Sequence, residues 1–171
     1  TYTFGSPHRP IEGYGSTAQV SRAPGAAAHL SHVRVDRDTG QVTLLAHVVA
    51  QDVGKALNPA LVEGQMHGGV AQGIGWALLE ELAFDEHGQL RGASFAEYAL
   101  PSTDQVPPIE TLIVEVPAPD GPFGAKGVGE RAVVAAPAAI ANAVAAAAGV
   151  RLSELPMTPA RVWRALRDHA S

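Results

Sequence analysis

Cysteine is absent from all 171 residues of the sequence, and aromatic residues make up only 5% of it. Without cysteine, the chain cannot form disulfides, thiolate zinc sites or cysteine-held iron–sulfur clusters. The scarcity of aromatics means that the core must be built mainly from Ala, Val, Leu and Ile. Charged residues are also few, at 17%, and the formal net charge of −5 gives no reason to expect binding to nucleic acid or to an anionic membrane.

The length and the 46% hydrophobic content suit one globular domain, which we place at residues 30–171, preceded by an extended arm at residues 1–29. The first residue is Thr1, and nothing near it reads as a signal peptide, so we expect a cytoplasmic protein, with export through a partner subunit left open. The longest apolar run, residues 132–150, contains Pro137 and Asn142. It predicts a buried helix rather than a membrane span.

Hydrophobic periodicity and turn residues divide the rest of the chain into elements. The expected order is two strands, a long helix, two further strands and two final helices. This ββαββαα order favours an α+β fold, with a mixed sheet and helices packed on one face in two layers. The predicted strands span residues 32–36, 41–53, 94–100 and 110–116, and the predicted helices span residues 60–82, 131–148 and 158–169.

The stretch PFGAKGVGE, residues 122–130, places three glycines, Lys126 and Glu130 directly before an alanine-rich helix. It lacks the Gly-Lys-Ser/Thr of a Walker A loop, and its glycines miss the dinucleotide-binding order. Two interpretations stay open from the residues alone. Either Glu130 sits favourably at a helix N-terminus, or backbone N–H groups and Lys126 hold an anion while Glu130 acts as a base.

The predicted long helix carries glycine at positions 64, 68, 69, 73 and 75, each of which costs about 1 kcal/mol relative to alanine. So much glycine suggests a face that a neighbour approaches very closely. Helix–helix packing would explain the spacing. It explains less well why Gln65 and Gln72 interrupt the apolar surface, because amides beside bare backbone suit a ligand rich in heteroatoms.

The seven histidines show no HExxH motif and no paired helical spacing, so the sequence supports no metal held by protein side chains. His8, His29, His87 and His169 are most simply surface or loop residues.

Two segments together resemble the C-terminal end of the molybdenum hydroxylases, the xanthine dehydrogenase and aldehyde oxidoreductase family. They are NPALVEGQMHGGVAQGIGWALLEE, residues 58–81, and GAKGVGE, residues 124–130. The segment FAEYALPSTDQVPPI, residues 95–109, looks like the strand and loop between them. The resemblance covers most of residues 30–148 and implies a molybdenum-cofactor-binding domain.

In that family a pyranopterin, not a side chain, holds the metal, so the resemblance implies molybdopterin as the cofactor. It further implies that Glu130 is the general base for hydroxylation of an aldehyde or N-heterocycle carbon, with oxygen from water and hydride transfer to Mo=S. Gln65 would hydrogen-bond around the cofactor. Six further residues would line it, namely Gly68, Gly69, Lys126, Gly127, Val128 and Gly129.

Two departures weaken a purine substrate: His67 stands where many relatives have Glu, and Arg131-Ala132 follow the base instead of two prolines. The resemblance also implies partners, because the rest of the molybdenum subunit and the iron–sulfur and flavin modules lie outside this chain. We therefore expect the chain alone to be an incomplete, inactive part of an oxidoreductase. Whether the pterin carries a cytosine nucleotide stays open. The alternative function is a non-catalytic module whose glycine face packs a partner helix.

Overall fold

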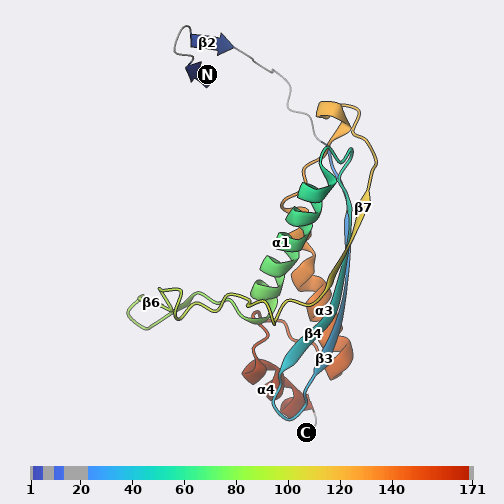
Figure 1. The fold of residues 1–171 in the computed structure, drawn as a ribbon. Helices are drawn as coiled ribbons and strands as arrows, with labels where there is room; N and C mark the ends of the chain where they lie inside the picture. The colour runs from blue at the N-terminus through green and yellow to red at the C-terminus, as the bar shows by residue number, and fades with distance from the viewer. Residues whose placement is uncertain (1, 6–9, 14–22, 170–171) are drawn as a thin grey trace.

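The computed structural model describes residues 2–5, 10–13 and 23–169. Its central element is a three-stranded β-sheet. Its strand order is β3–β4–β7 (Figure 1). The central strand β4 (Val42–Asp52) pairs antiparallel with β3 (Ala27–Val35).

The third strand, β7 (Ile109–Val114), pairs parallel with β4. A long helix and a short hairpin separate β4 from β7 in the sequence. This connection is long enough for the crossover that two parallel strands require. The sheet is therefore mixed, as predicted.

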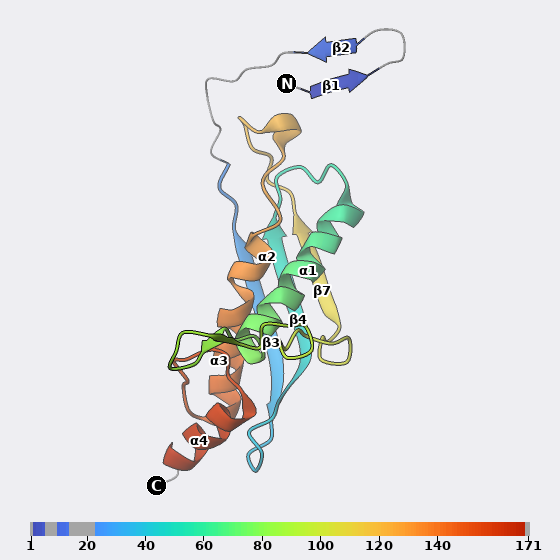
Figure 2. The same cartoon turned by 90° about the vertical axis from the view of Figure 1, so that its left-hand side faces the viewer.

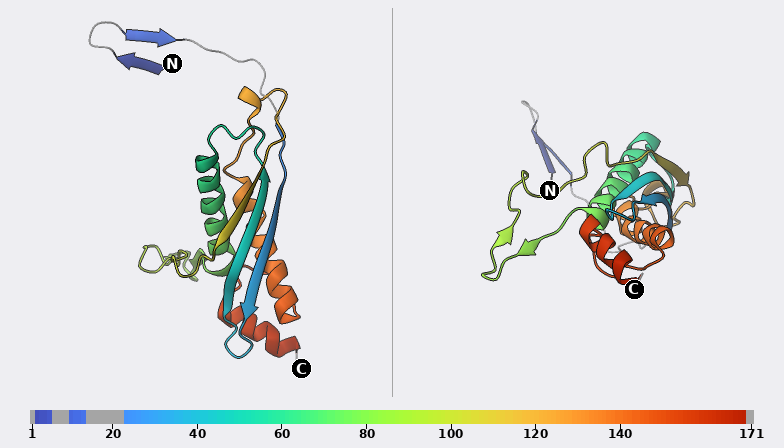
Figure 3. Two further views of the ribbon diagram at one scale, coloured as in Figure 1. Left: turned by 45° about the vertical axis from the view of Figure 1, so that its right-hand side comes forward. Right: turned by 90° about the horizontal axis from the view of Figure 1, so that it is seen from below.

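Three helices cover one face of this sheet (Figures 2 and 3). They are α1 (Pro59–Leu78), α2 (Arg131–Val134) and α3 (Ala136–Ala148). α1 contacts β4 and β7, whereas α3 lies along β3. A last helix, α4 (Pro159–His169), closes one end of the core. The predicted two-layer α+β fold is confirmed.

The start of α1 follows the local sequence closely. Asn58 is the N-cap residue, and its Oδ1 accepts a hydrogen bond from Leu61 N at 3.2 Å, while Pro59 occupies the first helical position. The helix ends at Leu78, a turn earlier than the pattern predicted, and Leu79 N donates to Gly75 O.

The alanine-rich segment predicted as one helix is split at Ala135 into α2 and α3. Pro137 explains the break, since it has no N–H and its ring clashes with the carbonyl one turn before it. The stretch Arg131–Ala148 is long and apolar enough for a membrane span by composition alone. Its Ile140 and Val144 are nevertheless fully buried in the core, as in the predicted core helix.

The prediction of a strand at residues 94–100 is wrong. Ser94 O accepts hydrogen bonds from Glu97 N and Tyr98 N, so the chain turns here instead of extending. Gly92, with a φ of +73°, precedes this turn and Pro101 ends the segment. A short hairpin stands in its place, formed by β5 (Ala83–Phe84) and β6 (Leu90–Arg91), and projects away from the sheet (Figure 1).

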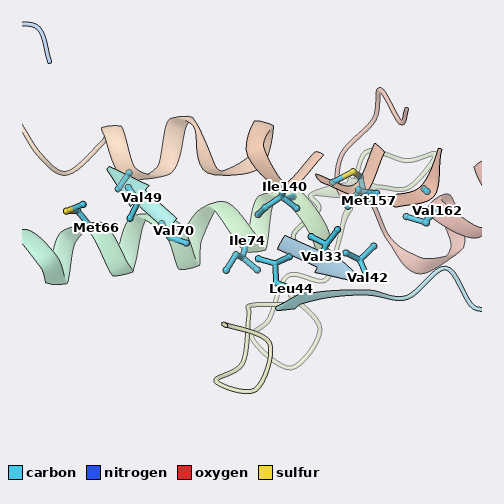
Figure 4. Close-up of a cluster of buried hydrophobic side chains, with 14 of the residues drawn as sticks. Val33, Val42, Leu44, Val49, Met66, Val70, Ile74, Ile140, Met157 and Val162 are labelled. Atoms are coloured by element: carbon cyan, nitrogen blue, oxygen red, sulfur yellow. The ribbon is translucent and has the colours of Figure 1, made fainter. Parts of the chain in front are cut away.

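The hydrophobic core lies between the sheet and the helices (Figure 4). Its fully buried side chains include Val49 of β4, Met66, Val70 and Ile74 of α1, and Ile140 of α3. The opposite face of the sheet carries no helix from the described part of the chain. On that face Leu30, Leu112 and Val114 are exposed.

The predicted arm at residues 1–29 lies partly outside the described residues. Within it, β1 (Tyr2–Gly5) and β2 (Pro10–Gly13) form a small antiparallel hairpin. β3 begins at Ala27, so residues 27–29 of the predicted arm belong to the sheet.

Candidate functional site

The loop of residues 124–130 is anchored to the chain at the end of β4. Lys126 N donates to Val53 O, and Lys55 N donates to Gly124 O, both at 2.9 Å. Gly54 lies at this crossing with a φ of +66°, and a Cβ there would collide with the carbonyl oxygen of Gly124. Only glycine permits both the conformation and the approach.

A buried ion pair lies beneath the loop. Lys126 Nζ donates to Asp52 Oδ2 at 2.6 Å, and the two side chains are only 9% and 14% exposed. The hydrogen bond from Lys126, followed by that from Gly54 N–H, holds the pKa of Asp52 below its usual value. The ammonium group of Lys126 is therefore engaged within the protein, and the cofactor contact predicted for it stays a prediction.

Arg131 ties the loop to two other segments. Its Nη1 donates to Gly127 O at 2.7 Å and to Asp52 O at 2.9 Å, and its Nη2 donates to Ala23 O at 3.1 Å. Sequence reasoning noted Arg131 only as a departure from the family pattern and did not single out Asp52. The pairing of Asp52 with Lys126 and the bonds from Arg131 to Asp52 O and Ala23 O have no local signal, because these partners lie 74 to 108 positions away in the chain.

The glycines of α1 divide between two faces. Gly69 and Gly73 face α2 and α3, where an added Cβ would lie 2.5 Å from the Cβ atoms of Ala132 and Ala136. Gly64 and Gly68 lie on the exposed side, with nothing within 4 Å of such a Cβ. Helix packing thus accounts for Gly69 and Gly73 within this chain, whereas Gly68 leaves open space beside the helix.

The exposed side of α1 meets the loop at Gln65. Gln65 Nε2 lies 3.7 Å from the position that a Cβ on Gly129 would occupy. A shallow apolar groove continues from this contact, lined in part by Leu57, Leu61 and Val128. Two glycine-containing segments more than fifty residues apart in the sequence are therefore adjacent in space.

Glu130 occupies the N-cap position of α2 and is exposed. Its backbone carbonyl accepts from Val133 N and Val134 N at 3.2 Å, but its side chain accepts nothing from the helix. No other described residue forms a hydrogen bond or ion pair with this carboxylate. Glu130 thus lies at a helix N-terminus, as the first interpretation expected, but its side chain caps no N–H group of the helix. Within the described part of the chain, the carboxylate is free to meet a ligand.

Three backbone N–H groups of the loop are also without a partner in the described part of the chain. Gly127, Val128 and Gly129 donate to no acceptor among the described residues. A Cβ on Gly127 would meet no atom within 4 Å. A run of unpaired backbone donors with bare glycine beside it is suited to hydrogen-bond a heteroatom-rich or anionic group.

These residues fit molybdopterin better than a metal ion held by the protein. In the described part of the chain, no group of three or more His, Asp and Glu side chains could hold a metal. Gln65 and the N–H groups of residues 127–129 could instead bond the edges of a pterin, with Gly68 and Gly127 leaving room for it. These residues would hold the cofactor.

One buried polar residue, His47, was not singled out by the sequence reasoning. His47 is fully buried, with Nδ1 2.9 Å from Ser31 Oγ and Nε2 3.0 Å from His29 Nδ1. Burial, and secondarily the neighbouring His29, lowers the pKa of His47 to about 4. The prediction of His29 as a surface or loop residue is wrong, because it lies in β3 on the face toward the helices.

Comparison with known proteins agrees with this geometry. The molybdopterin cofactor-binding domain family matches residues 3–107. The chain is 43% identical over 142 residues to the nicotine 6-hydroxylase large subunit of Paenarthrobacter nicotinovorans, covering 81% of this chain and 17% of that protein. It is 41% identical over 140 residues to the aldehyde oxidoreductase of Megalodesulfovibrio gigas, covering 81% of this chain and 15% of that one.

Solved structures share the fold. Quinoline 2-oxidoreductase from Pseudomonas putida 86 superposes with a TM-score of 0.76 at 39% identity, covering 80% of this chain and 18% of that one. The Cu,Mo-CO dehydrogenase superposes with a TM-score of 0.78 at 32% identity, over 85% of this chain and 19% of that one. The chain thus spans about a fifth of the length of the relatives it matches. It belongs to the molybdopterin cofactor-binding domain family of the molybdenum hydroxylases.

Proposed function

We propose that this chain is the C-terminal molybdenum-cofactor-binding part of a hydroxylase that acts on an aldehyde or N-heterocycle carbon, with Glu130 as the general base. The observation that carries the proposal is the carboxylate of Glu130, which has no partner among the described residues and directly follows Gly129, the glycine nearest to Gln65 Nε2. Relatives named for nicotine hydroxylation and aldehyde oxidation support both substrate classes.

In this proposal, different residues of the site bind the cofactor and transfer the proton. Bound molybdopterin supplies the two-electron redox chemistry and the site at which oxygen from water is delivered. Gln65 and the N–H groups of Gly127 to Gly129 bind and orient the cofactor, because their hydrogen-bonding capacity is not used by described residues. Glu130 takes up the proton that the reacting hydroxyl group loses.

We further propose that the rest of the molybdenum subunit covers the surfaces this chain leaves apolar. Leu30 on the open sheet face is 62% exposed. On the projecting segment, Phe84 is 63% and Phe95 88% exposed. Exposed apolar side chains gathered in this way are typical of surfaces that another protein segment buries. Iron–sulfur and flavin partners would carry the electrons away, since a chain without cysteine holds no cysteine-ligated cluster.

Replacing Glu130 by Gln in the full-length subunit tests the catalytic role. We expect turnover to fall by about 100- to 10,000-fold, the range that general-base catalysis contributes. Molybdenum content and melting temperature should stay at the wild-type level, because the Glu130 carboxylate forms no hydrogen bond or ion pair with a described residue. Glu86→Gln, at an exposed turn far along the chain, is the matched control and should keep full activity.

Turnover of the Glu130→Gln enzyme at the wild-type rate would rule out the catalytic proposal. It would favour the non-catalytic alternative, in which the chain only packs against a partner. The buried glycines no longer support that alternative, since Gly69 and Gly73 already pack against α2 and α3 of the same chain.

A further inference from the structure

Gln51 is a fully buried amide close to the end of β4, with 0% of its surface exposed. Its neighbours on the same face of the strand are the apolar residues Val49 and Val53, which are 0% and 1% exposed. An apolar side chain would satisfy packing at this position. A buried amide is costly unless its polar atoms are hydrogen-bonded, so its presence calls for a specific partner.

That partner is the loop that carries Glu130. Gln51 Nε2 donates to Val128 O at 2.8 Å, across 77 positions of sequence. Gln51 Oε1 is buried and accepts from no described residue. The contact to Val128 is therefore the one polar interaction that the structure shows for this side chain within the described part of the chain.

Holding the Val128 carbonyl also orients the next N–H. The carbonyl of Val128 and the N–H of Gly129 belong to one planar peptide unit, and in a trans peptide they point in opposite directions. Because the carbonyl points to Gln51 in the core, the Gly129 N–H points away from the core. Gly129 is exposed, and a Cβ on it would lie 3.7 Å from Gln65 Nε2, so this peptide lies on the exposed side of the loop near Gln65.

We propose that Gln51 is a positioning residue, which fixes the Val128–Gly129 peptide so that the Gly129 N–H donates to the molybdopterin. The proposal rests on the proposed function of the site and adds a residue that does not itself touch the cofactor. Glycine at positions 127 and 129 makes the loop flexible. The hydrogen bond from Gln51 on the rigid strand β4 reduces the number of conformations that the free loop adopts, so less conformational entropy is lost when the loop binds the cofactor.

The test replaces Gln51 by Met in the full-length subunit, which keeps the side-chain volume and removes the donor. Ser31→Ala is the matched control. It removes a hydrogen bond on the same buried face, between Ser31 and His47, that does not reach the loop. Both variants are compared with wild type by molybdenum and pterin content per subunit, by melting temperature, and by amide hydrogen exchange of residues 124–130 with and without cofactor.

We expect Gln51→Met to retain about 3- to 10-fold less cofactor and to lose the protection of Gly129, a change of the size expected for one hydrogen bond. Ser31→Ala should retain wild-type cofactor content, even if its melting temperature falls. Full cofactor content and full Gly129 protection in Gln51→Met would overturn the positioning role and leave the proposed function intact. A wild-type enzyme in which the cofactor leaves Gly129 unprotected would contradict both.

A second measurement does not depend on the folding of a variant. A crystal structure of the wild-type enzyme with its cofactor should show Gly129 N within hydrogen-bond distance of the cofactor and Val128 O still on Gln51. A cofactor bound elsewhere on the loop, with the Gly129 N–H free, would refute the inference.

Discussion

Lys126 Nζ lies 2.6 Å from Asp52 Oδ2, so the one lysine of the glycine loop points into the protein rather than out of it. The pair joins the last residue of β4 to the loop that carries Glu130. Gln51, Asp52 and Val53 thus hold this loop in succession, through a side-chain amide, a carboxylate and a backbone carbonyl. The position of Glu130 depends on this end of the sheet.

Asp52→Asn should destabilise the chain by about 3 kcal/mol, because it leaves the buried Lys126 ammonium without a counter-charge. Urea unfolding of the 171-residue chain at neutral pH measures the change. The matched control is Glu115→Gln, which breaks an exposed ion pair with Lys55. The Lys55 side chain is 53% exposed and the Glu115 side chain is 39% exposed. That control should change stability much less, because solvent screens an exposed ion pair. Equal losses in the two variants would show that the Asp52 pair is not buried in solution.

Gly68→Ala and Gly69→Ala should move stability in opposite directions, although the two glycines are adjacent on α1. A Cβ at position 68 meets open space, so alanine should stabilise the helix by up to about 1 kcal/mol. A Cβ at position 69 would lie 2.5 Å from Ala132 Cβ, so alanine should cost about 1–3 kcal/mol through overpacking.

Thermal unfolding of both glycine variants provides the measurement, and cofactor content in the full-length subunit adds a second readout. If Gly68 lines the cofactor, Gly68→Ala should lower cofactor content in spite of its higher melting temperature. A Gly69→Ala chain as stable as wild type would contradict the packing of α1 on α2.

His47 should make the chain less stable as the pH falls from about 6.5 to 4. In the folded chain its pKa is lowered to about 4 by burial and by His29, whereas in the unfolded chain it keeps its ordinary value. The unfolded state therefore binds more protons in this window, and stability is lost as the pH falls. The loss should reach up to about 3 kcal/mol by pH 4.

Urea unfolding at several pH values between 4 and 7 follows this loss. A His47→Leu variant serves as the comparison and should show a shallower dependence on pH over the same range. A wild-type dependence that begins only below pH 4 would point to carboxylates such as Asp52 instead, since the lowered pKa of that group places its contribution at more acid pH.

Local patterns in the sequence were sufficient for most of the elements. The apolar spacing from Leu61 to Leu78 predicted α1, because periodicity is a property of neighbouring residues. The prediction of a strand at residues 94–100 was wrong because a strand also depends on its neighbours in space. Its composition suited a strand, but no strand in the described part of the chain lies beside residues 94–100 to supply the backbone hydrogen bonds that a strand requires.

The candidate site was predictable only in part. The adjacency of Gln65 and the loop before Glu130 followed from the family resemblance, and the structure brings these residues together. The roles of Gln51, Asp52 and Arg131 did not follow, because their partners lie 74 to 108 positions away or are backbone carbonyls that any sequence provides.

By itself, the sequence determined which segments become helices and strands, the family of the chain, and the presence of a carboxylate beside flexible glycines. These features depend on residue type and short-range spacing. Only the tertiary structure decided which glycines face a neighbouring helix and which face open space. It also decided that Lys126 pairs with Asp52 inside the protein. Such outcomes depend on how α1, α2 and the end of β4 pack, since burial and distance arise between segments far apart in the chain.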